Sequence, residues 1–316
     1  MPEYLGTQDN ASFSSQVPGL QIVWDSTSLG ALKKCPRLYY LTHVMGYVPR
    51  AQRVDLEFGI FAHSTRERYY HARAQGAPHD KALDVALDYL LRATWDARLG
   101  RPWSTTDANK NRLTLVRSMV WYLDQFAEDT LATLILGNGK PAVELSFRFE
   151  TTYLARTGEP FQLAGHLDRA VVYNGAPKLS DLKTTKHTID QKYREQFTPD
   201  NQFSLYDFAA PIVLGPRVDP GIVVDAIQVA VTFTRMERFI VTRTQSQRDE
   251  WYDDLGMWLS MAEGFARAQR WPHNDRNCFR CDLRAVCRRP PGSREQWLAS
   301  DYERRVWDPT RARGDV

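Results

Sequence analysis

The sequence lacks the features that mark several large classes of protein. No apolar run is long enough to cross a bilayer, because charged residues interrupt the longest stretches. The first residues, MPEYLGTQDN, are polar and hold no apolar signal core, so we expect a cytoplasmic protein. Neither the GxGxxG fingerprint nor the GxxxxGK[ST] P-loop is present, which argues against a flavin- or nicotinamide-dependent redox protein and against a built-in helicase motor.

Cysteine is also scarce, and the four that are present are Cys35, Cys278, Cys281 and Cys287. Disulfides are rare in the cytosol, and a C-x₂-C spacing indicates metal binding instead. Structural zinc usually takes two paired knuckles, whereas Cys35 stands alone, far upstream of the other three. An iron–sulfur cluster accepts thiolates from scattered positions. The spacing alone leaves zinc and iron–sulfur open.

The chain as a whole has no large excess of positive or of negative residues. Lys and Arg number 41 against 38 Asp and Glu, a formal net charge of +3. The basic excess is local and falls in the last segment, which includes Arg284, Arg288 and Arg289. Charge alone favours a solvated tail, but the same cluster could follow a phosphate backbone if the chain binds nucleic acid.

Hydrophobic periodicity divides the chain into four parts. We expect a loose lead-in over 1–24 and then a helical region over 25–137 that carries Cys35 and His63. Its first helix is expected to start near Ser26 or Ser28 and to run to about His43. Apolar residues at helical spacing predict further helices at about 57–74, from Leu83 to Leu91 and from Leu113 to Leu131.

The pattern then changes to short alternating strands. We expect strands at 141–150, 161–173 and 178–185, a helix at 199–213, two strands over 221–243 separated near Met236 and Glu237, and a long amphipathic helix. These form a core over 138–270, followed by a small metal-tied module with a basic tail over 271–316. The fold class is therefore α/β, with a mixed sheet flanked by helices.

Two neighbouring strands carry three charged side chains in positions that are not typical of solvent-exposed residues. Asp168 lies in LAGHLDRAVV, and Asp181 and Lys183 share a face of the next strand. Two carboxylates that converge on one point suit Mg²⁺ or Mn²⁺, and a lysine beside them can orient water or stabilise a charged phosphate. A buried Asp–Lys ion pair of purely structural use is the alternative for an isolated D-x-K.

The order GHLD, a 13-residue step, then DLKTTK closely resembles the PD-(D/E)XK nuclease superfamily. Within it, the chain is similar to the RecB-like branch, which includes the AddB nuclease domains and the iron–sulfur nuclease of CRISPR adaptation modules. FGIFAHSTRERYY places His63 where that branch has a metal-binding histidine, and Gln202 and Tyr206 match its Gln-x-x-x-Tyr motif. The resemblance spans about residues 26–287 and implies a restriction-endonuclease-like fold.

The resemblance implies a role for each matched residue. Asp168 and Asp181 would hold Mg²⁺ or Mn²⁺ together with His63 and the Leu182 carbonyl, and Lys183 would activate the attacking water. Gln202 and Tyr206 would line the nucleic-acid side, Tyr206 by base contact, with Arg284, Arg288 and Arg289 on the DNA backbone. Glu144 could join the acidic cluster or be a solvated strand residue. The four cysteines would hold a [4Fe–4S] cluster.

The implied activity is metal-dependent hydrolysis of single-stranded DNA from an end, with 5′ to 3′ polarity favoured, in recombination, repair or CRISPR-type processing. Helicase, recombination or CRISPR proteins are the expected partners besides DNA. Two alternatives stay open: an endonuclease or end-trimming subunit of a larger complex, and a non-catalytic DNA-binding scaffold built on the iron–sulfur module. The complete set of His63, Asp168, Asp181 and Lys183 counts against the scaffold.

Overall fold

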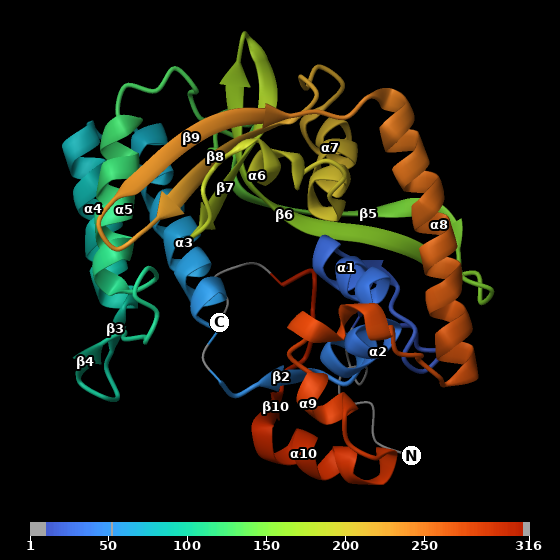
Figure 1. The fold of residues 1–316 in the computed structure, drawn as a ribbon. Helices are drawn as coiled ribbons and strands as arrows, with labels where there is room; N and C mark the ends of the chain where they lie inside the picture. Colours follow the sequence, from blue (N-terminus) through green and yellow to red (C-terminus); the bar gives the residue numbers. More distant parts are fainter. Residues whose placement is uncertain (1–10, 52, 312–316) are drawn as a thin grey trace. The chain divides into compact units, whose positions relative to one another are not determined.

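The structure is a computed structural model that describes residues 11–51 and 53–311 (Figure 1). It divides into two compact units, each built from separate segments of the chain. Unit 1 comprises residues 1–52, 146–166 and 245–316, and unit 2 comprises residues 53–145 and 167–244. The long strands β5 (Val143–Leu154) and β6 (Pro160–Tyr173) each contribute residues to both. No helix in the described ranges is long and apolar enough to span a bilayer.

Unit 2 holds a mixed sheet, as the sequence predicted. The second half of β6 runs antiparallel to β7 (Ala176–Thr185), β7 is parallel to β8 (Ile222–Val229), and β8 is antiparallel to β9 (Thr234–Val241). The short helix α6 (Gln191–Glu195) and the helix α7 (Asn201–Leu214) connect β7 to β8. This connection is long enough to allow β7 and β8 to be parallel neighbours.

Three helices of unit 2 cover one face of this sheet: α3 (Val54–Ala74), α4 (His79–Ala93) and α5 (Arg112–Gln125) (Figure 1). The small hairpin β3 (Trp95–Asp96) and β4 (Arg101–Pro102) joins α4 to α5. The common core contains buried residues of the helices and of β7 and β8, among them Phe58, Leu90, Met119, Leu182 and Ile227. The helices of unit 2 and its sheet are thus packed as one layer upon another.

A buried ionic network ties these layers together. Asp225 of β8 accepts hydrogen bonds from Arg66 of α3 at 3.0 Å, from the Tyr122 hydroxyl of α5 at 2.7 Å, and from Arg238 of β9 at 2.6 Å. Arg238 also binds Asp129 with two bonds of 2.9 Å. Burial raises the pKa of Asp225, but Arg66 and Arg238 outweigh it and hold that pKa below its usual range. The carboxylate is therefore charged and fully paired.

The turn between β8 and β9 lies at residues 230–233, so the predicted break near Met236 and Glu237 is wrong. The sequence AVTF has no glycine or proline to mark a turn. Its exposed carbonyls are satisfied by one side chain instead, because Arg117 of α5 donates to the carbonyls of Ala230, Val231 and Phe233.

Unit 1 contains the two ends of the chain. Its elements are β1 (Val23–Trp24), α1 (Ser26–Lys34), α2 (Pro36–Tyr39), a π-helical turn (Tyr40–Val44), β2 (Tyr47–Pro49), α8 (Gln245–Ala268), two 3₁₀ turns (Asp275–Arg280 and Pro291–Ser293), α9 (Arg284–Cys287), α10 (Arg294–Asp301) and β10 (Tyr302–Arg304). β1 pairs in parallel with β6 at Gln162 and Leu163, and β10 pairs antiparallel with β2.

Residues 11–24 are packed, whereas we expected a loose lead-in over 1–24; residues 1–10 lie outside the described ranges. Leu20, Val23 and Trp24 are fully buried, and the indole of Trp24 donates to the carbonyl of Gln21. These apolar residues are interspersed with Ser, Gly and Gln, which hides their pattern in the sequence.

The expected helix up to His43 is broken at Cys35. Asp25 is the N-cap of α1, with Ser28 completing a capping box, so Ser26 and Ser28 are not themselves the cap. Pro36 disfavours a helical conformation at the residue before it, and Cys35 is extended, with φ −169° and ψ 117°. The chain then resumes as α2. The single upstream cysteine thus stands at a break between two helices.

We predict that Asp225→Asn destabilises the protein by about 3–5 kcal/mol, because it leaves the buried guanidinium of Arg66 without its main carboxylate partner and removes one of the two carboxylates that bind the half-buried Arg238. Urea unfolding measures this loss. The control is Asp84→Asn, which removes an exposed partner of Lys81 and should change stability by less than about 0.5 kcal/mol. Equal effects of the two changes would contradict the assigned importance of the network.

Candidate metal centre

Helix α3 presents three polar side chains toward the sheet of unit 2. His63, Arg66 and Tyr70 are spaced three and four residues apart and therefore share one helix face. His63 Nδ1 lies 2.9 Å from Asp168 Oδ2, and Arg66 lies 3.9 Å from the same oxygen. The helix thus brings an imidazole and a fixed positive charge to Asp168.

The strands β6 and β7 supply the two carboxylates. In the antiparallel register, Arg169 of β6 pairs with Ser180 of β7. Asp168 is the residue before Arg169, and Asp181 is the residue after Ser180. Both aspartates therefore lie at the same end of the ladder. Leu182 donates its backbone N–H to Asp168 at 3.1 Å. Both aspartates are buried, and among the described residues Asp181 Oδ1 has no hydrogen-bond partner. A buried oxygen of this kind is available to a cation.

The pKa of Asp181 is shifted by its surroundings. Burial raises its pKa, and the nearby Asp168 raises it further, while Lys183 and His63 oppose this. The net direction is upward. Two carboxylates so close repel each other when both are ionised, which a divalent cation between them would relieve.

Lys183 is held by its neighbours. Its ammonium lies 2.8 Å from Asp181 and donates to Gln202 Oε1 at 2.8 Å. The Gln202 amide in turn donates to the Tyr206 hydroxyl at 3.0 Å. Helix α7 begins at Asn201, where the side chain of Asp200 caps it, so Gln202 and Tyr206 stand one turn apart on its first turns. The chain of contacts fixes the lysine at the carboxylate pair.

Tyr206 is only 4% exposed. We expected its ring to contact DNA bases, but a ring buried to this degree offers little surface for stacking. Its observed contact is with Gln202, the residue that binds Lys183. This burial disfavours the expected base contact.

Glu144 joins this cluster. Its carboxylate, the imidazole of His63 and the carboxylate of Asp168 each offer a ligand atom, and these atoms lie within 4.8 Å of one another. Glu144 also has φ 51°, a left-handed conformation that glutamate rarely adopts. Such backbone strain is typically retained where a side chain must be aimed at a site. Sequence reasoning left the role of Glu144 undecided.

Arg66, Tyr70 and Arg169 were not singled out from the sequence. All three line the small cavity that His63, Glu144 and Asp168 also line, and all three are at least 96% buried. The spacing of Arg66 and Tyr70 behind His63 on one helix face was the available signal.

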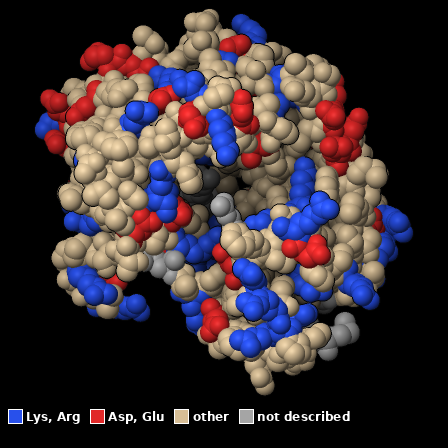
Figure 2. Space-filling model, viewed as in Figure 1, with Lys and Arg blue, Asp and Glu red and all other residues tan. Residues whose placement is uncertain are grey.

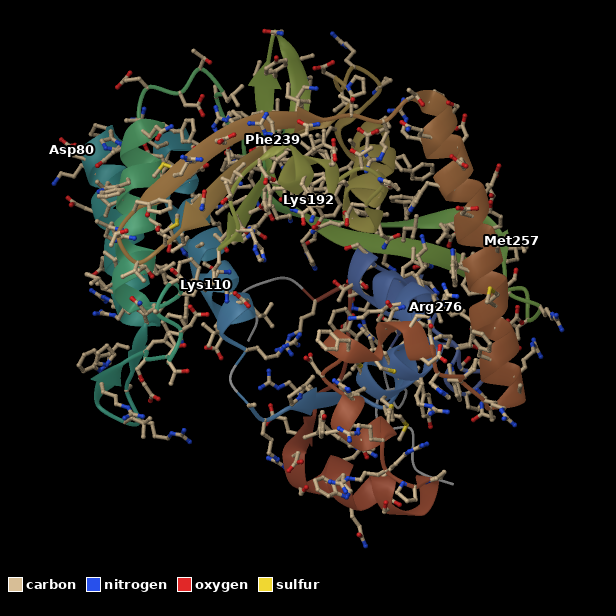
Figure 3. All side chains as sticks on the ribbon, in the orientation of Figure 1. Asp80, Lys110, Lys192, Phe239, Met257 and Arg276 are labelled. Carbon is tan, nitrogen blue, oxygen red and sulfur yellow. The ribbon has the colours of Figure 1, made fainter. Side chains whose placement is uncertain are left out.

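The predicted cysteine and arginine groups belong to unit 1. The four cysteines line one cavity there, and the backbone N–H of Asn274 donates to Cys35 Sγ at 3.2 Å. Arg276, labelled in Figure 3, is in the 3₁₀ turn that carries Cys278. Arg284, Arg288 and Arg289 are exposed, and Figure 2 shows Lys and Arg side chains gathered over α9 and α10.

Comparisons with known proteins were made for sequence and for fold. The fold is similar to the crystal structure of a candidate exonuclease from Eubacterium rectale, with a TM-score of 0.46, 10% identity, and coverage of 89% of this chain and 94% of that one. A second similar structure is SSO0001, with a TM-score of 0.32, 12% identity, and coverage of 83% and 96%. No curated protein matches the sequence.

The family is shown by a sequence model. The model of the PD-(D/E)XK nuclease superfamily matches residues 26–288, which include the whole metal centre. The chain belongs to this superfamily and is a nuclease, a hydrolase of the class that uses divalent metal ions. Its mixed sheet flanked by helices confirms the predicted fold class.

We predict that Asp181→Ala and Lys183→Ala each lower cleavage at least about a hundredfold, for different reasons. The first removes an oxygen ligand and should weaken Mn²⁺ binding, whereas the second should leave Mn²⁺ affinity close to that of the wild type. Calorimetric titration with Mn²⁺ separates the two. Wild-type cleavage by the Lys183→Ala protein would show that the lysine has only the structural role of an ion pair.

Proposed function

We propose that the chain is a metal-dependent DNA exonuclease. The observation that carries this proposal is the convergence of His63, Asp168, Asp181 and Lys183 in one cluster of unit 2. A structural Asp–Lys pair would need no histidine and no second buried carboxylate. Membership of a nuclease superfamily gives the cluster its reaction class.

The donor set suits a hard divalent cation. His63, Asp168, Asp181 and the Leu182 carbonyl would hold Mg²⁺ or Mn²⁺, and Glu144 adds a further carboxylate beside His63 and Asp168. When bound, the ion supplies a lowered pKa for water and neutralises charge on the phosphate. The partnerless Asp181 Oδ1 supports this assignment, because a buried carboxylate oxygen is costly without a partner.

Lys183 would orient the attacking water and stabilise negative charge that develops on the scissile phosphate. Its contact with Asp181 and its bond to Gln202 limit its rotation. Gln202 and Tyr206 thereby act on the reaction through the lysine. Arg66, fixed by Ser180 and Asp225, holds Asp168 from behind the site.

We further propose that the substrate is single-stranded DNA attacked from an end, with 5′ to 3′ polarity, in recombination, repair or CRISPR-type processing. Arg284, Arg288 and Arg289 would attract the phosphate backbone. Arg289 is held over the ring of Trp297 at 3.8 Å, which keeps its charge at the surface. A separate helicase, recombination or CRISPR protein would supply the strand.

The deciding experiment compares linear and circular single-stranded DNA of equal length. We expect degradation of the linear form only, with release of label from the 5′ end first, and no cleavage by Asp181→Ala. The rate should fall steeply with salt, because each neutralised phosphate releases counterions. Equal cleavage of the circle would assign an endonuclease instead, and release from the 3′ end would reverse the polarity.

We propose that the cysteines of unit 1 hold an iron–sulfur cluster. Cys35, Cys278, Cys281 and Cys287 line one cavity there, so four thiols are available to one centre. Structural zinc usually takes two paired knuckles, whereas Cys35 is far upstream of the other three. An iron–sulfur cluster accepts thiolates from scattered positions, and we assign [4Fe–4S] as in the RecB-like branch.

The proposed cluster would tie an early segment of the chain to a late one, which restricts the unfolded chain and stabilises unit 1. Reduced thiols are required for it, consistent with action in the cytoplasm.

We predict that anaerobically purified protein is brown and contains four irons per chain. Cys278→Ala and Cys35→Ala should each lose the colour and lower the thermal midpoint, while His273→Ala, which lines the same cavity without a thiolate, should keep both. Metal analysis and visible absorbance measure these outcomes. A colourless protein with one bound zinc would contradict the cluster and leave the nuclease proposal intact.

A further inference from the structure

A second cavity of unit 2, of about 330 Å³, lies between the C-terminal half of α3 and residues 126–135. Its size falls in the range of small-molecule sites. Apolar side chains of Phe126, Leu131 and Ile135 line part of it, and Arg73 and Arg169 line another part. The cavity therefore combines an apolar surface with two arginines and with Asp129, a carboxylate that Arg238 binds.

Arg169 is the most unusual of these residues. It is only 2% exposed, and it donates to the Thr133 hydroxyl at 3.0 Å and to the Leu131 carbonyl. Among the described residues no carboxylate lies within ion-pair distance of it, and its second terminal nitrogen has no hydrogen-bond partner. A buried cation without a counter-ion is costly, so an anion at this position would stabilise it.

Two further donors stand at the same wall. The ring of Tyr70 lies 3.4 Å from the guanidinium of Arg169, and the Tyr70 hydroxyl is buried without a hydrogen-bond partner in the described structure. Arg73 binds only the backbone carbonyls of Ala77 and Ala127, and it too has no carboxylate partner there. Asp129 also lines the cavity, but Arg238 binds both of its carboxylate oxygens, so these three donors have no carboxylate partner among the described residues.

The cavity adjoins the metal centre. Tyr70 and Arg169 line both this cavity and the small one that contains His63, Glu144 and Asp168. A group bound on Arg169 would therefore lie next to the carboxylates, within the reach of one nucleotide unit of a strand.

We propose that this cavity binds one phosphate-bearing nucleotide of the DNA strand that the metal centre cuts. Arg169, Arg73 and the Tyr70 hydroxyl bind the phosphate, and the apolar side chains of Phe126, Leu131 and Ile135 receive the base. The inference rests on the proposed nuclease function for the identity of the strand, but the binding of a nucleotide phosphate can be measured without cleavage.

The sharpest variant is Tyr70→Phe, which removes one hydroxyl and no packing. We expect the Asp181→Ala protein to bind thymidine 5′-phosphate in EDTA, and thymidine or inorganic phosphate at least about tenfold more weakly. Adding Tyr70→Phe should weaken binding of the nucleotide about tenfold and leave the thermal midpoint equal or higher, because the lost hydroxyl is unpartnered. Tyr89→Phe, elsewhere in the same helical layer, is the matched control and should change neither.

A charge pair gives the second test. Arg73→Gln should weaken nucleotide binding, whereas Arg68→Gln, which removes an exposed charge from the same helix, should not. Equal affinity for thymidine and its phosphate, or unchanged binding by both Tyr70→Phe and Arg73→Gln, would overturn the proposal.

Displacement distinguishes the strand from a free mononucleotide. Linear oligothymidylate should displace bound thymidine 5′-phosphate from the Asp181→Ala protein; failure to displace it would overturn the assignment to the strand. If the wild-type protein cleaves DNA but binds no nucleotide in this assay, the proposed nucleotide site in the cavity is wrong and the proposed nuclease function stands. Nucleotide binding without any cleavage of DNA would refute the nuclease and keep a nucleotide-phosphate site.

Discussion

The repulsion between two buried carboxylates, Asp168 and Asp181, is the constraint around which unit 2 is arranged. Antiparallel pairing of β6 with β7 puts both at one end of the ladder, in surroundings that penalise charge. Neighbouring groups from two elements reduce that penalty: His63 and Arg66 from α3, and Lys183 and the backbone N–H of Leu182 from β7. A structure that kept this arrangement for stability alone could replace it with apolar residues at little cost. The arrangement is better explained by a cation that binds there.

The ionic network on the helical face of the sheet serves the same constraint. Arg66 is the shared member, because it binds Asp225 and Ser180 and also approaches Asp168. The pairing of Asp225 with Tyr122 and Arg238 connects α5 and β9 to this arginine. The positive charge held behind Asp168 therefore depends on contacts with α5, β7, β8 and β9 as well as on α3.

The parts of the site that follow from local periodicity could be predicted from the sequence. Alternation in β6 and β7 placed Asp168, Asp181 and Lys183, and the i, i+4 spacing placed Gln202 and Tyr206 on one turn of α7. Features that depend on tertiary partners could not be predicted. The turn at 230–233 is held by Arg117 rather than by glycine, and the burial of Tyr206 arises from packing around α7. The two units also have other boundaries than the regions expected from the sequence, because β5 and β6 each contribute residues to both units.

The metal centre and the adjoining cavity carry opposite charges. The centre concentrates carboxylates that repel DNA phosphates, whereas Arg169 and Arg73 form a cationic wall with no carboxylate partner among the described residues. Each half is unfavourable by itself: the acidic half needs a cation and the basic half needs an anion. A divalent ion on one side and a nucleotide phosphate on the other would satisfy both at once, with Tyr70 and Arg169 between them. The two sites would then support each other electrostatically, so that occupation of either one favours binding at the other.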